Sequence, residues 1–390
     1  MTADNLEPRT SNLEPRQPPD ARLIIAASEA DANLYYATRF LAPDPFVFLW
    51  HGAEKILLMS DLEVDRARSQ AVVDSVLPIR EYEERAKRSG AERPSLLDGL
   101  HELLKERSVG SVLVPGSFPI EHGDGLRGWG IDVQVKREPF FEERLVKSPA
   151  EIEAITAALR RTETALDAAI TAIREADVRD GMLWWRGTVL TSEGVKRLVA
   201  KDLLEVGLIA SHTIVACGTD GCDPHNQGSG PLRAEQPIIL DIFPRDTTTQ
   251  YFADITRTVV KGRASEMVGQ MYQAVAAGQE CAFDLIRDGA DGEAVHRSVQ
   301  QAMEGRGFRT GELNGRMQGF FHGTGHGLGL DIHELPRVSK VRATLRAGNV
   351  VTVEPGLYYP GVGGVRIEDV VVVTETGCRN LTSYPKVLEV

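Results

Sequence analysis

The run from Phe321 to Glu334, FHGTGHGLGLDIHE, constrains this chain more than any other stretch. It holds three histidines and four glycines, a composition too irregular for a helix or a plain strand. Glycine lets a backbone approach a ligand or take positive φ, and histidine is the commonest metal ligand and a frequent acid or base near neutral pH. His322 and His326 are four residues apart, but glycine follows the first of them where HExxH has glutamate, and His333 is seven further on, so neither pair fits the HExxH helix of single-zinc proteases. A lone histidine would more often be structural, but three in one loop predict a binding or catalytic site.

Four apolar, β-branched runs elsewhere in the chain are interrupted by a carboxylate, and each run predicts a strand. The four acids are Asp241 in PIILDIF, Asp254 in YFADITRTVV, Glu354 in NVVTVEPGLY and Glu368 in GVRIEDVVVVT. A charge inside an apolar strand costs several kcal/mol unless it is paired or ligates a metal. For any single acid, an ion pair with Arg257 or Arg366 is the alternative. As a set, and together with the histidine run, the four acids predict a two-metal site.

These residues occur in a fixed order along the chain, within the motifs DITRT, GHGLGLDIHELP, VEPGLY and GVRIEDVVVVT. The pattern resembles the five metal ligands of the pita-bread metallopeptidases, which include methionine aminopeptidases, Xaa-Pro aminopeptidases and prolidases. The resemblance extends from about Arg22 to the end of the chain and is weaker before Ser148. It implies an α+β fold, in which a smaller α/β creatinase-like N-terminal domain precedes a pita-bread catalytic domain.

The resemblance also implies a role for each residue of the site. Asp241 would chelate one ion, Asp254 and Glu368 would bridge the two ions, and His326 and Glu354 would hold the other. Glu354 would also exchange protons with the bridging hydroxide and the leaving amine. The non-ligand residues match family histidines that orient the substrate and stabilise the tetrahedral intermediate, and an arginine that supports the ligands. They are His225, His322, His333 and Arg366.

The expected cofactors are two divalent ions, which lie roughly 3.5 to 4 Å apart in such sites and activate a bridging hydroxide. A carboxylate-rich set with one imidazole suits Mn²⁺ or Co²⁺, with Zn²⁺ as a further candidate. One departure concerns the spacing, because Asp241 and Asp254 are thirteen residues apart, wider than is usual in the family, and Phe243 replaces a usual glycine. Two extra loop residues preserve the facing of both strands, since side chains alternate with period two. Asp246 is an alternative first ligand, although its polar PRDTTT surroundings favour a turn.

We therefore expect a dinuclear exopeptidase whose partner is a peptide with proline at the second position. Methionine aminopeptidase activity is the alternative, disfavoured by the N-terminal domain and by His322, which better matches the Xaa-Pro branch. A metal-free creatinase-type hydrolase and a peptide-binding pseudoenzyme are disfavoured because all five ligands are intact. The sequence leaves open whether dipeptides or longer peptides are cleaved.

Composition excludes several other classes of function. A net charge of −12 and a pI near 5.4 argue against a nucleic-acid partner. The sequence shows neither an eighteen-residue apolar run nor a signal pattern, which predicts a cytoplasmic protein without a membrane partner. Four cysteines in so long a chain predict no disulfide framework. Cys217, Cys222 and His225 could begin a zinc finger, but further ligands at the required spacing are missing.

Residues 1–20 repeat NLEPR and predict a disordered tail, and residues 21–147 alternate strand and helix patterns, as in an α/β domain. In the family this domain covers part of the active site and forms a homodimer. A capping box at Ser148, with proline at the first helical position, predicts a long helix that opens the catalytic domain, residues 148–390. There we expect helices over residues 265–287 and 292–305, all on one side of a largely antiparallel sheet.

Overall fold

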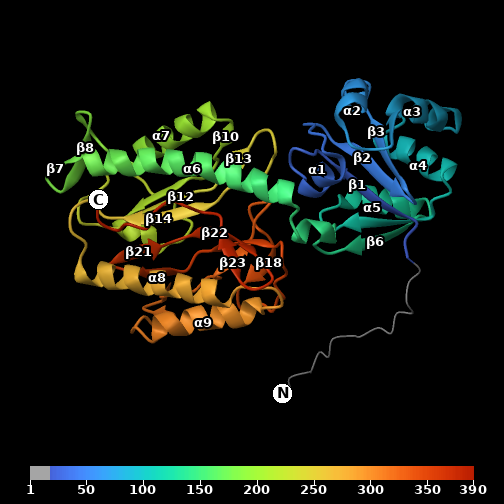
Figure 1. Cartoon of the computed structure of the whole chain (residues 1–390). Coiled ribbons are helices and arrows are strands. Elements are labelled where there is room, and N and C mark those ends of the chain that lie inside the picture. The colour runs from blue at the N-terminus through green and yellow to red at the C-terminus, as the bar shows by residue number, and fades with distance from the viewer. Residues whose placement is uncertain (1–17) are drawn as a thin grey trace, which may run out of the picture. The chain divides into compact units, whose positions relative to one another are not determined.

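A computed structural model describes residues 18–390, so most of the predicted tail lies outside the described residues. The chain forms two compact units that divide between Phe141 and Glu142 (Figure 1). The expected domain boundary before Ser148 stays a prediction. Within residues 18–390 no helix is both long enough and apolar enough to cross a membrane.

The first unit is built around one mixed sheet. Its elements are β1 (Ala21–Ala26), α1 (Ala32–Thr38), β2 (Phe46–His51), β3 (Glu54–Met59), α2 (Val64–Gln70), β4 (Ser75–Pro78), α3 (Ile79–Arg88), α4 (Leu96–Glu106), β5 (Ser111–Pro115), α5 (Ile120–Gly128) and β6 (Asp132–Lys136). The strand order is β4-β3-β2-β1-β5-β6. Successive β1 residues Leu23 and Ile24 enter apolar clusters on opposite faces, because side chains alternate along a strand. Both faces of this sheet are therefore buried, as expected for an α/β unit.

The second unit holds the residues predicted to form the site. Its helices are α6 (Pro149–Glu175), α7 (Ser192–Glu205), α8 (Glu266–Leu285) and α9 (Gly292–Glu304), with 3₁₀ turns at Glu142–Leu145 and Gly218–Cys222. Its strands are β7 (Asp177–Arg179), β8 (Met182–Trp185), β9 (Thr188–Val189), β10 (Leu208–Ile209), β11 (Ile214–Cys217), β12 (Ile238–Ile242), β13 (Arg245–Asp246), β14 (Ile255–Val259), β15 (Gly311–Leu313), β16 (Arg316–Gln318), β17 (Gly325–Gly327), β18 (Glu334–Val338), β19 (Val350–Val353), β20 (Gly356–Tyr359), β21 (Gly363–Arg366), β22 (Asp369–Val373) and β23 (Cys378–Asn380).

Two antiparallel sheets of this unit meet at the predicted site. One has the order β11-β12-β14 and the other β18-β17-β19-β22-β23, and an isolated bridge between Thr256 and Glu368 joins them. Helix α6 lies along one side of the strands and α8 and α9 along the other (Figure 1). The two helices expected over residues 265–287 and 292–305 thus lie on one side of the strands, and α6 covers the other side. Each of the two sheets presents an apolar face that needs its own helical cover.

Helix α6 begins as its sequence predicts. The Ser148 hydroxyl accepts the amide of Glu151, the Glu151 carboxylate accepts the amide of Ser148, and Pro149 occupies the first turn. Such reciprocal bonds satisfy backbone donors that would otherwise lack partners at a helix start. Apolar residues that recur at three- and four-residue spacing are buried along one face of the helix, from Ile155 to Ile173.

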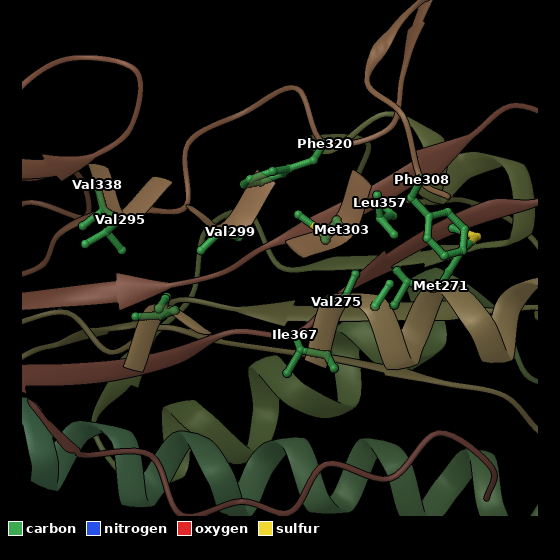
Figure 2. Packing of buried hydrophobic residues seen from close by; sticks show 14 of the residues in the cluster. Met271, Val275, Val295, Val299, Met303, Phe308, Phe320, Val338, Leu357 and Ile367 are labelled. Atoms are coloured by element: carbon green, nitrogen blue, oxygen red, sulfur yellow. The ribbon is translucent and has the colours of Figure 1, made fainter. Parts of the chain in front are cut away.

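The core under α8 and α9 supports the strands that carry the ligands (Figure 2). Val275 of α8 and Val299 and Met303 of α9 are fully buried in one cluster with Leu357 and Ile367 of the strand region. Each fully buried side chain of this size stabilises the fold by about 1.5 to 3 kcal/mol. The apolar side chains of these strands thus pack against α8 and α9, and their polar side chains face a cavity.

The run from Gly364 to Thr374 differs from its predicted form. It divides into β21 and β22, which belong to different sheets, and Glu368 lies between them. The Glu368 amide donates to the Thr256 carbonyl at 3.0 Å, so this residue pairs with the other half of the unit. Alternating apolar residues predict a strand but do not reveal where it changes sheets.

Candidate metal centre

Five acidic or histidine side chains converge on one cavity. Ligand atoms of Asp254, His326 and Glu368 all lie within 4.8 Å of one another, and within residues 18–390 this is the group that could hold a metal ion. Asp241 and Glu354 line the same cavity, whose volume is about 760 Å³. Asp241 lies on β12 and His326 on β17, whereas Asp254 directly precedes β14, Glu354 directly follows β19 and Glu368 lies between β21 and β22. The structure thus brings together the five side chains that the sequence singled out, although their roles as ligands stay a prediction.

Glycines let the histidine run enter the sheet between two close neighbours. A Cβ atom at Gly325 would lie 1.9 Å from the Thr352 carbonyl oxygen, and one at Gly327 would lie 2.4 Å from that of Leu335. No side chain fits at those distances, so only glycine can flank His326 here. This close packing explains the GHG sequence and fixes the direction of the imidazole between them.

The surroundings of His326 assign its tautomer and leave a gap in its bonding. Its Nδ1 lies 3.1 Å from the Gly327 carbonyl oxygen, which can only accept, so Nδ1 carries the proton. Its Nε2 lies 3.3 Å from Glu354 Oε1 and 3.8 Å from Asp254 Oδ2. With the Nδ1 proton so engaged, Nε2 faces two carboxylates, and three acceptors in contact require a cation or a proton among them. The donor set therefore fits a metal ion.

Asp241 shows the same unfilled bonding capacity. Its Oδ2 accepts from Arg366 Nη2 at 2.6 Å, whereas its Oδ1 is buried and has no hydrogen-bond donor among the described residues. A buried acceptor without a partner costs free energy, and such groups usually mark an ion or a water. Arg366 also donates to the Tyr358 hydroxyl at 2.9 Å. Arg366 thus holds one oxygen of Asp241 and leaves the other directed to the site.

The remaining carboxylates repel one another. Burial, and then the charges of Glu368, Asp241 and Glu354, raise the pKa of Asp254 well above its ordinary value. Burial and the charges of Glu354 and Asp241 likewise raise the pKa of Glu368 well above its usual range. Burial also raises the pKa of Asp241, although Arg366 opposes this. A protein would place these anions together at such a cost only if a cation binds among them.

Glu354 is the exception within the cluster. Burial disfavours its charge, but a proton on His326 Nε2, which in the metal-free protein takes the place of a cation, supplies a hydrogen bond and a positive charge that outweigh burial and lower the pKa of Glu354 to about 2. The Thr352 hydroxyl, which accepts the His326 amide at 3.1 Å, also lies 3.3 Å from Glu354 Oε1. Glu354 is therefore held ionised beside the imidazole.

Three further histidines line the same cavity. The His322 Nδ1 lies 2.8 Å from the Gly323 carbonyl oxygen and its Nε2 lies 2.8 Å from the Tyr358 hydroxyl, so both ring nitrogens have protein partners. The His333 ring lies edge-on to that of His326 at a centroid distance of 4.3 Å. His333 is partly exposed, but the burial of the rest of its ring, and then the neighbouring His326, lower its pKa to about 4, so it is neutral at pH 7. His225 lines the cavity from the segment after β11.

An ion cluster anchors the end of the histidine run. The Glu334 carboxylate, next to His333, accepts from Lys147 Nζ at 2.8 Å and pairs with Arg144. These three side chains are almost completely buried. The segment that leads into α6 thereby fixes the loop that carries His333, a contact that the sequence did not indicate.

The alternative ligands lie elsewhere. The Asp246 carboxylate accepts from the amides of Thr248 and Thr249 at 2.8 and 2.7 Å, pairs with Arg161 and is not among the cavity residues. Asp246 is thus the last residue of β13, and its side chain caps the polar turn that follows. The Cys222 thiol donates to the Tyr359 carbonyl oxygen at 3.2 Å, and within residues 18–390 no metal-binding group includes it.

Sequence reasoning missed several residues that orient the ligands. Thr256 donates from its hydroxyl to Glu368 Oε2 at 2.7 Å, Tyr358 links Arg366 to His322, and Arg337 lines the cavity. A threonine or tyrosine in a strand carries no spacing signal of its own. Only the DITRT motif, which contains Thr256, contained a hint of this support.

Comparisons with known proteins agree with this geometry. Residues 153–375 match metallopeptidase family M24. The Xaa-Pro dipeptidase of Pyrococcus furiosus is 27% identical over 359 residues, which cover 91% of this chain and 92% of that protein. The crystal structure of an X-Pro aminopeptidase from Thermotoga maritima is similar, with a TM-score of 0.78 and 24% identity over 95% of this chain and 98% of that one. The prolidase of Pyrococcus horikoshii has a TM-score of 0.76 and 26% identity over 95% of both chains. The predicted fold class, a pita-bread unit preceded by an α/β unit, is thereby confirmed.

Proposed function

Because this chain belongs to metallopeptidase family M24, we propose that it is an exopeptidase that uses two divalent metal ions to hydrolyse Xaa-Pro bonds. The observation that carries this proposal is the convergence of Asp254, His326 and Glu368 within 4.8 Å, in a cavity that Asp241 and Glu354 also line. Relatives named Xaa-Pro dipeptidase and X-Pro aminopeptidase support the choice of substrate. Cytoplasmic location and a homodimer stay predictions.

The five converging side chains would hold the metal ions. Four carboxylates balance the charge of two divalent ions, and oxygen donors with one imidazole suit Mn²⁺ or Co²⁺ better than thiolate-binding metals. When bound, such ions supply an activated water and polarise the scissile carbonyl. Arg366 occupies Asp241 Oδ2, so Asp241 would bind through Oδ1.

The other residues of the cavity would bind substrate and move protons. Glu354, ionised in the structure, would accept a proton from the attacking water and return it to the leaving amine. Neutral His333 would donate a hydrogen bond to the oxyanion that develops on the scissile carbonyl, and His225 would orient the substrate. Both ring nitrogens of His322 have hydrogen-bond partners, Tyr358 and Gly323. His322 would therefore contact the substrate only if the substrate displaces the Tyr358 hydroxyl, and would otherwise act through Tyr358.

The cavity also supports a preference for dipeptides. Its lining includes apolar side chains suited to a proline ring, namely Ile214, Phe243, Phe321 and Ile332. Arg337 lines the same cavity and is exposed, on β18 close to His333. An Xaa-Pro dipeptide has a free carboxylate directly after its proline, and a guanidinium binds a carboxylate with two hydrogen bonds. We therefore favour dipeptidase activity over cleavage of longer peptides.

A substrate panel tests this function. Purified protein loaded with Mn²⁺ should hydrolyse Xaa-Pro dipeptides with a higher kcat/KM than the matching Xaa-Pro-Yaa tripeptides or Met-Ala-Yaa peptides. Faster cleavage of the Met-Ala peptides would instead indicate methionine aminopeptidase activity. No hydrolysis of any member of the panel by fully metal-loaded protein would contradict peptidase function.

A further inference from the structure

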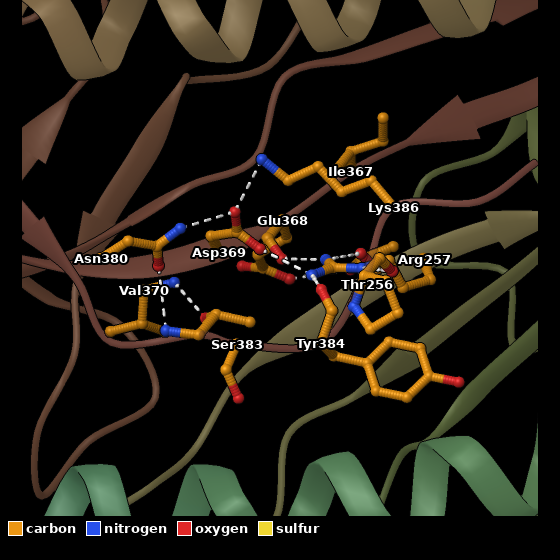
Figure 3. A network of polar contacts seen from close by, with 12 residues as sticks. Thr256, Arg257, Ile367, Glu368, Asp369, Val370, Asn380, Ser383, Tyr384 and Lys386 are labelled. Carbon is orange, nitrogen blue, oxygen red and sulfur yellow. Dashed lines mark hydrogen bonds and ion pairs between the residues drawn. The ribbon is translucent and has the colours of Figure 1, made fainter.

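A buried ion pair lies directly behind the proposed metal ligands (Figure 3). It joins Arg257 of β14 to Asp369 of β22, and their side chains are only 2% and 1% exposed. Neither residue lines the cavity. We infer that Arg257 and Asp369, together with the segment after β23, are positioning residues that hold Glu368 in its metal-binding orientation. This inference rests on the metal site proposed above.

Glu368 needs such support because of where it lies. It falls in the break between β21 and β22, so a continuous strand ladder does not fix its backbone on both sides. Its amide donates to the Thr256 carbonyl oxygen at 3.0 Å, and its carboxylate accepts from the Thr256 hydroxyl at 2.7 Å. Its carbonyl oxygen accepts from Arg257 Nη1 at 2.7 Å. Two neighbouring residues of β14 therefore fix Glu368 at three points.

Arg257 uses its whole guanidinium in this task. Nη1 donates to the carbonyl oxygens of Thr256 at 2.9 Å and Glu368 at 2.7 Å. Nη2 donates to Asp369 Oδ1 at 2.8 Å and to the Tyr384 carbonyl oxygen at 2.6 Å, and Nε donates to that of Pro385 at 3.1 Å. A guanidinium has five N–H donors in a planar fork, and here there are five acceptors. Lysine has three donors on a single nitrogen and could not reach all of these acceptors.

The partner Asp369 is held equally firmly. Its Oδ2 accepts from Lys386 Nζ at 2.9 Å and from Asn380 Nδ2 at 3.0 Å (Figure 3). The segment from Asn380 to Lys386 therefore supplies both carbonyl acceptors for Arg257 and donors for Asp369. This segment closes the back of the site although it lies outside the ligand motifs in the sequence.

The charges of this cluster are balanced. Asp369 pairs with both Arg257 and Lys386, and Glu280 Oε1 lies 3.7 Å from Lys386 Nζ. Two cations thus face two anions, so the cluster acts on Glu368 through its geometry.

The test is the substitution Arg257→Lys in the full chain, with Mn²⁺ affinity measured by calorimetry on chelator-treated protein. We expect about tenfold weaker binding of Mn²⁺, the lower range for losing a residue that orients a metal ligand. The melting temperature of the metal-free protein and its circular dichroism are recorded alongside. If Arg257→Lys does not fold, Lys386→Met, at a side chain 26% exposed, tests the same cluster from its outer side. It should weaken Mn²⁺ binding in the same direction.

The matched control is Arg161→Lys. Arg161 also pairs with a buried aspartate, Asp246, but that pair fixes a turn outside the cavity. The control should lower the melting temperature and leave Mn²⁺ affinity unchanged. Equal Mn²⁺ affinity in wild-type, Arg257→Lys and Lys386→Met proteins would overturn the inference and leave the proposed function intact. Absence of Mn²⁺ binding by the wild-type protein would overturn both.

Discussion

The strongest test of the carboxylate cluster is Asp254→Asn, which should have opposite effects with and without metal. In the metal-free protein, Asp254 is buried among Asp241, Glu354 and Glu368, whose charges raise its pKa well above the ordinary value. An acid with a raised pKa in the folded state destabilises that state as pH rises above the ordinary value, so at pH 7 its charge opposes folding. Removing the charge should therefore stabilise the metal-free protein.

The size of this effect follows from the geometry. Ligand atoms of Asp254 and Glu368 lie within 4.8 Å, where two like charges repel by roughly 3.5 kcal/mol at an effective dielectric constant of 20. Proton uptake already relieves part of this repulsion in the wild type, so we expect a gain of about 1 kcal/mol. For a unit of this size that corresponds to a melting temperature about 2 to 4 °C higher. Scanning calorimetry in the presence of a chelator measures it.

With bound metal, the order of the two melting temperatures should reverse, so that the wild type melts at the higher temperature. Mn²⁺ at one hundred times its Kd stabilises a protein by about 2.7 kcal/mol, and Asp254→Asn should lose this gain together with a bridging ligand. Activity should fall by several orders of magnitude. A metal-free variant that melts at or below the wild-type temperature would refute the reasoning that these acids repel one another.

Asp246→Asn is the control for both effects. Although burial opposes its charge, hydrogen bonds from the Thr249 amide and from Arg161 outweigh burial and lower the pKa of Asp246. A lowered pKa means that the carboxylate stabilises the fold above its ordinary pKa and loses this effect as pH falls through the folded value. Asp246→Asn should therefore lower the melting temperature and leave metal binding and kcat intact. Loss of metal in this variant but not in Asp241→Asn would show that the first ligand is misassigned.

Chelation should abolish activity, and Mn²⁺ or Co²⁺ should restore it best, because the proposed ligands are oxygens and one imidazole; full activity in metal-free protein would refute a two-metal site. His333→Ala should lower kcat while metal analysis still finds both ions, whereas His326→Ala should lose metal, since of these two histidines it is His326 that lies within 4.8 Å of the ligand atoms of Asp254 and Glu368. Arg337→Met should raise KM for Xaa-Pro dipeptides more than for their amides, which lack the terminal carboxylate; equal effects on both would exclude a carboxylate contact.

The sequence by itself predicted those parts of the protein in which local chemistry decides the outcome. The capping box at Ser148 set the start of α6 because its hydrogen bonds join residues three apart. The glycines around His326 predicted a close approach of the backbone, and the charged residues in apolar strands predicted a binding site, which lies in the cavity. Resemblance to the family named the five side chains that the structure brings to one cavity.

Tertiary structure alone decided how those side chains are supported. The alternation from Gly364 to Thr374 reads as one strand, yet the chain changes sheets at Glu368 because Thr256 and Arg257 offer it partners from the other half of the unit. Lys147 and Glu334 are 187 residues apart, a separation far beyond the length of any local sequence motif. The residues that a helix or strand buries recur with a short period, so a pattern along the sequence can predict them. The partner that satisfies a buried charge is chosen only when distant segments pack together.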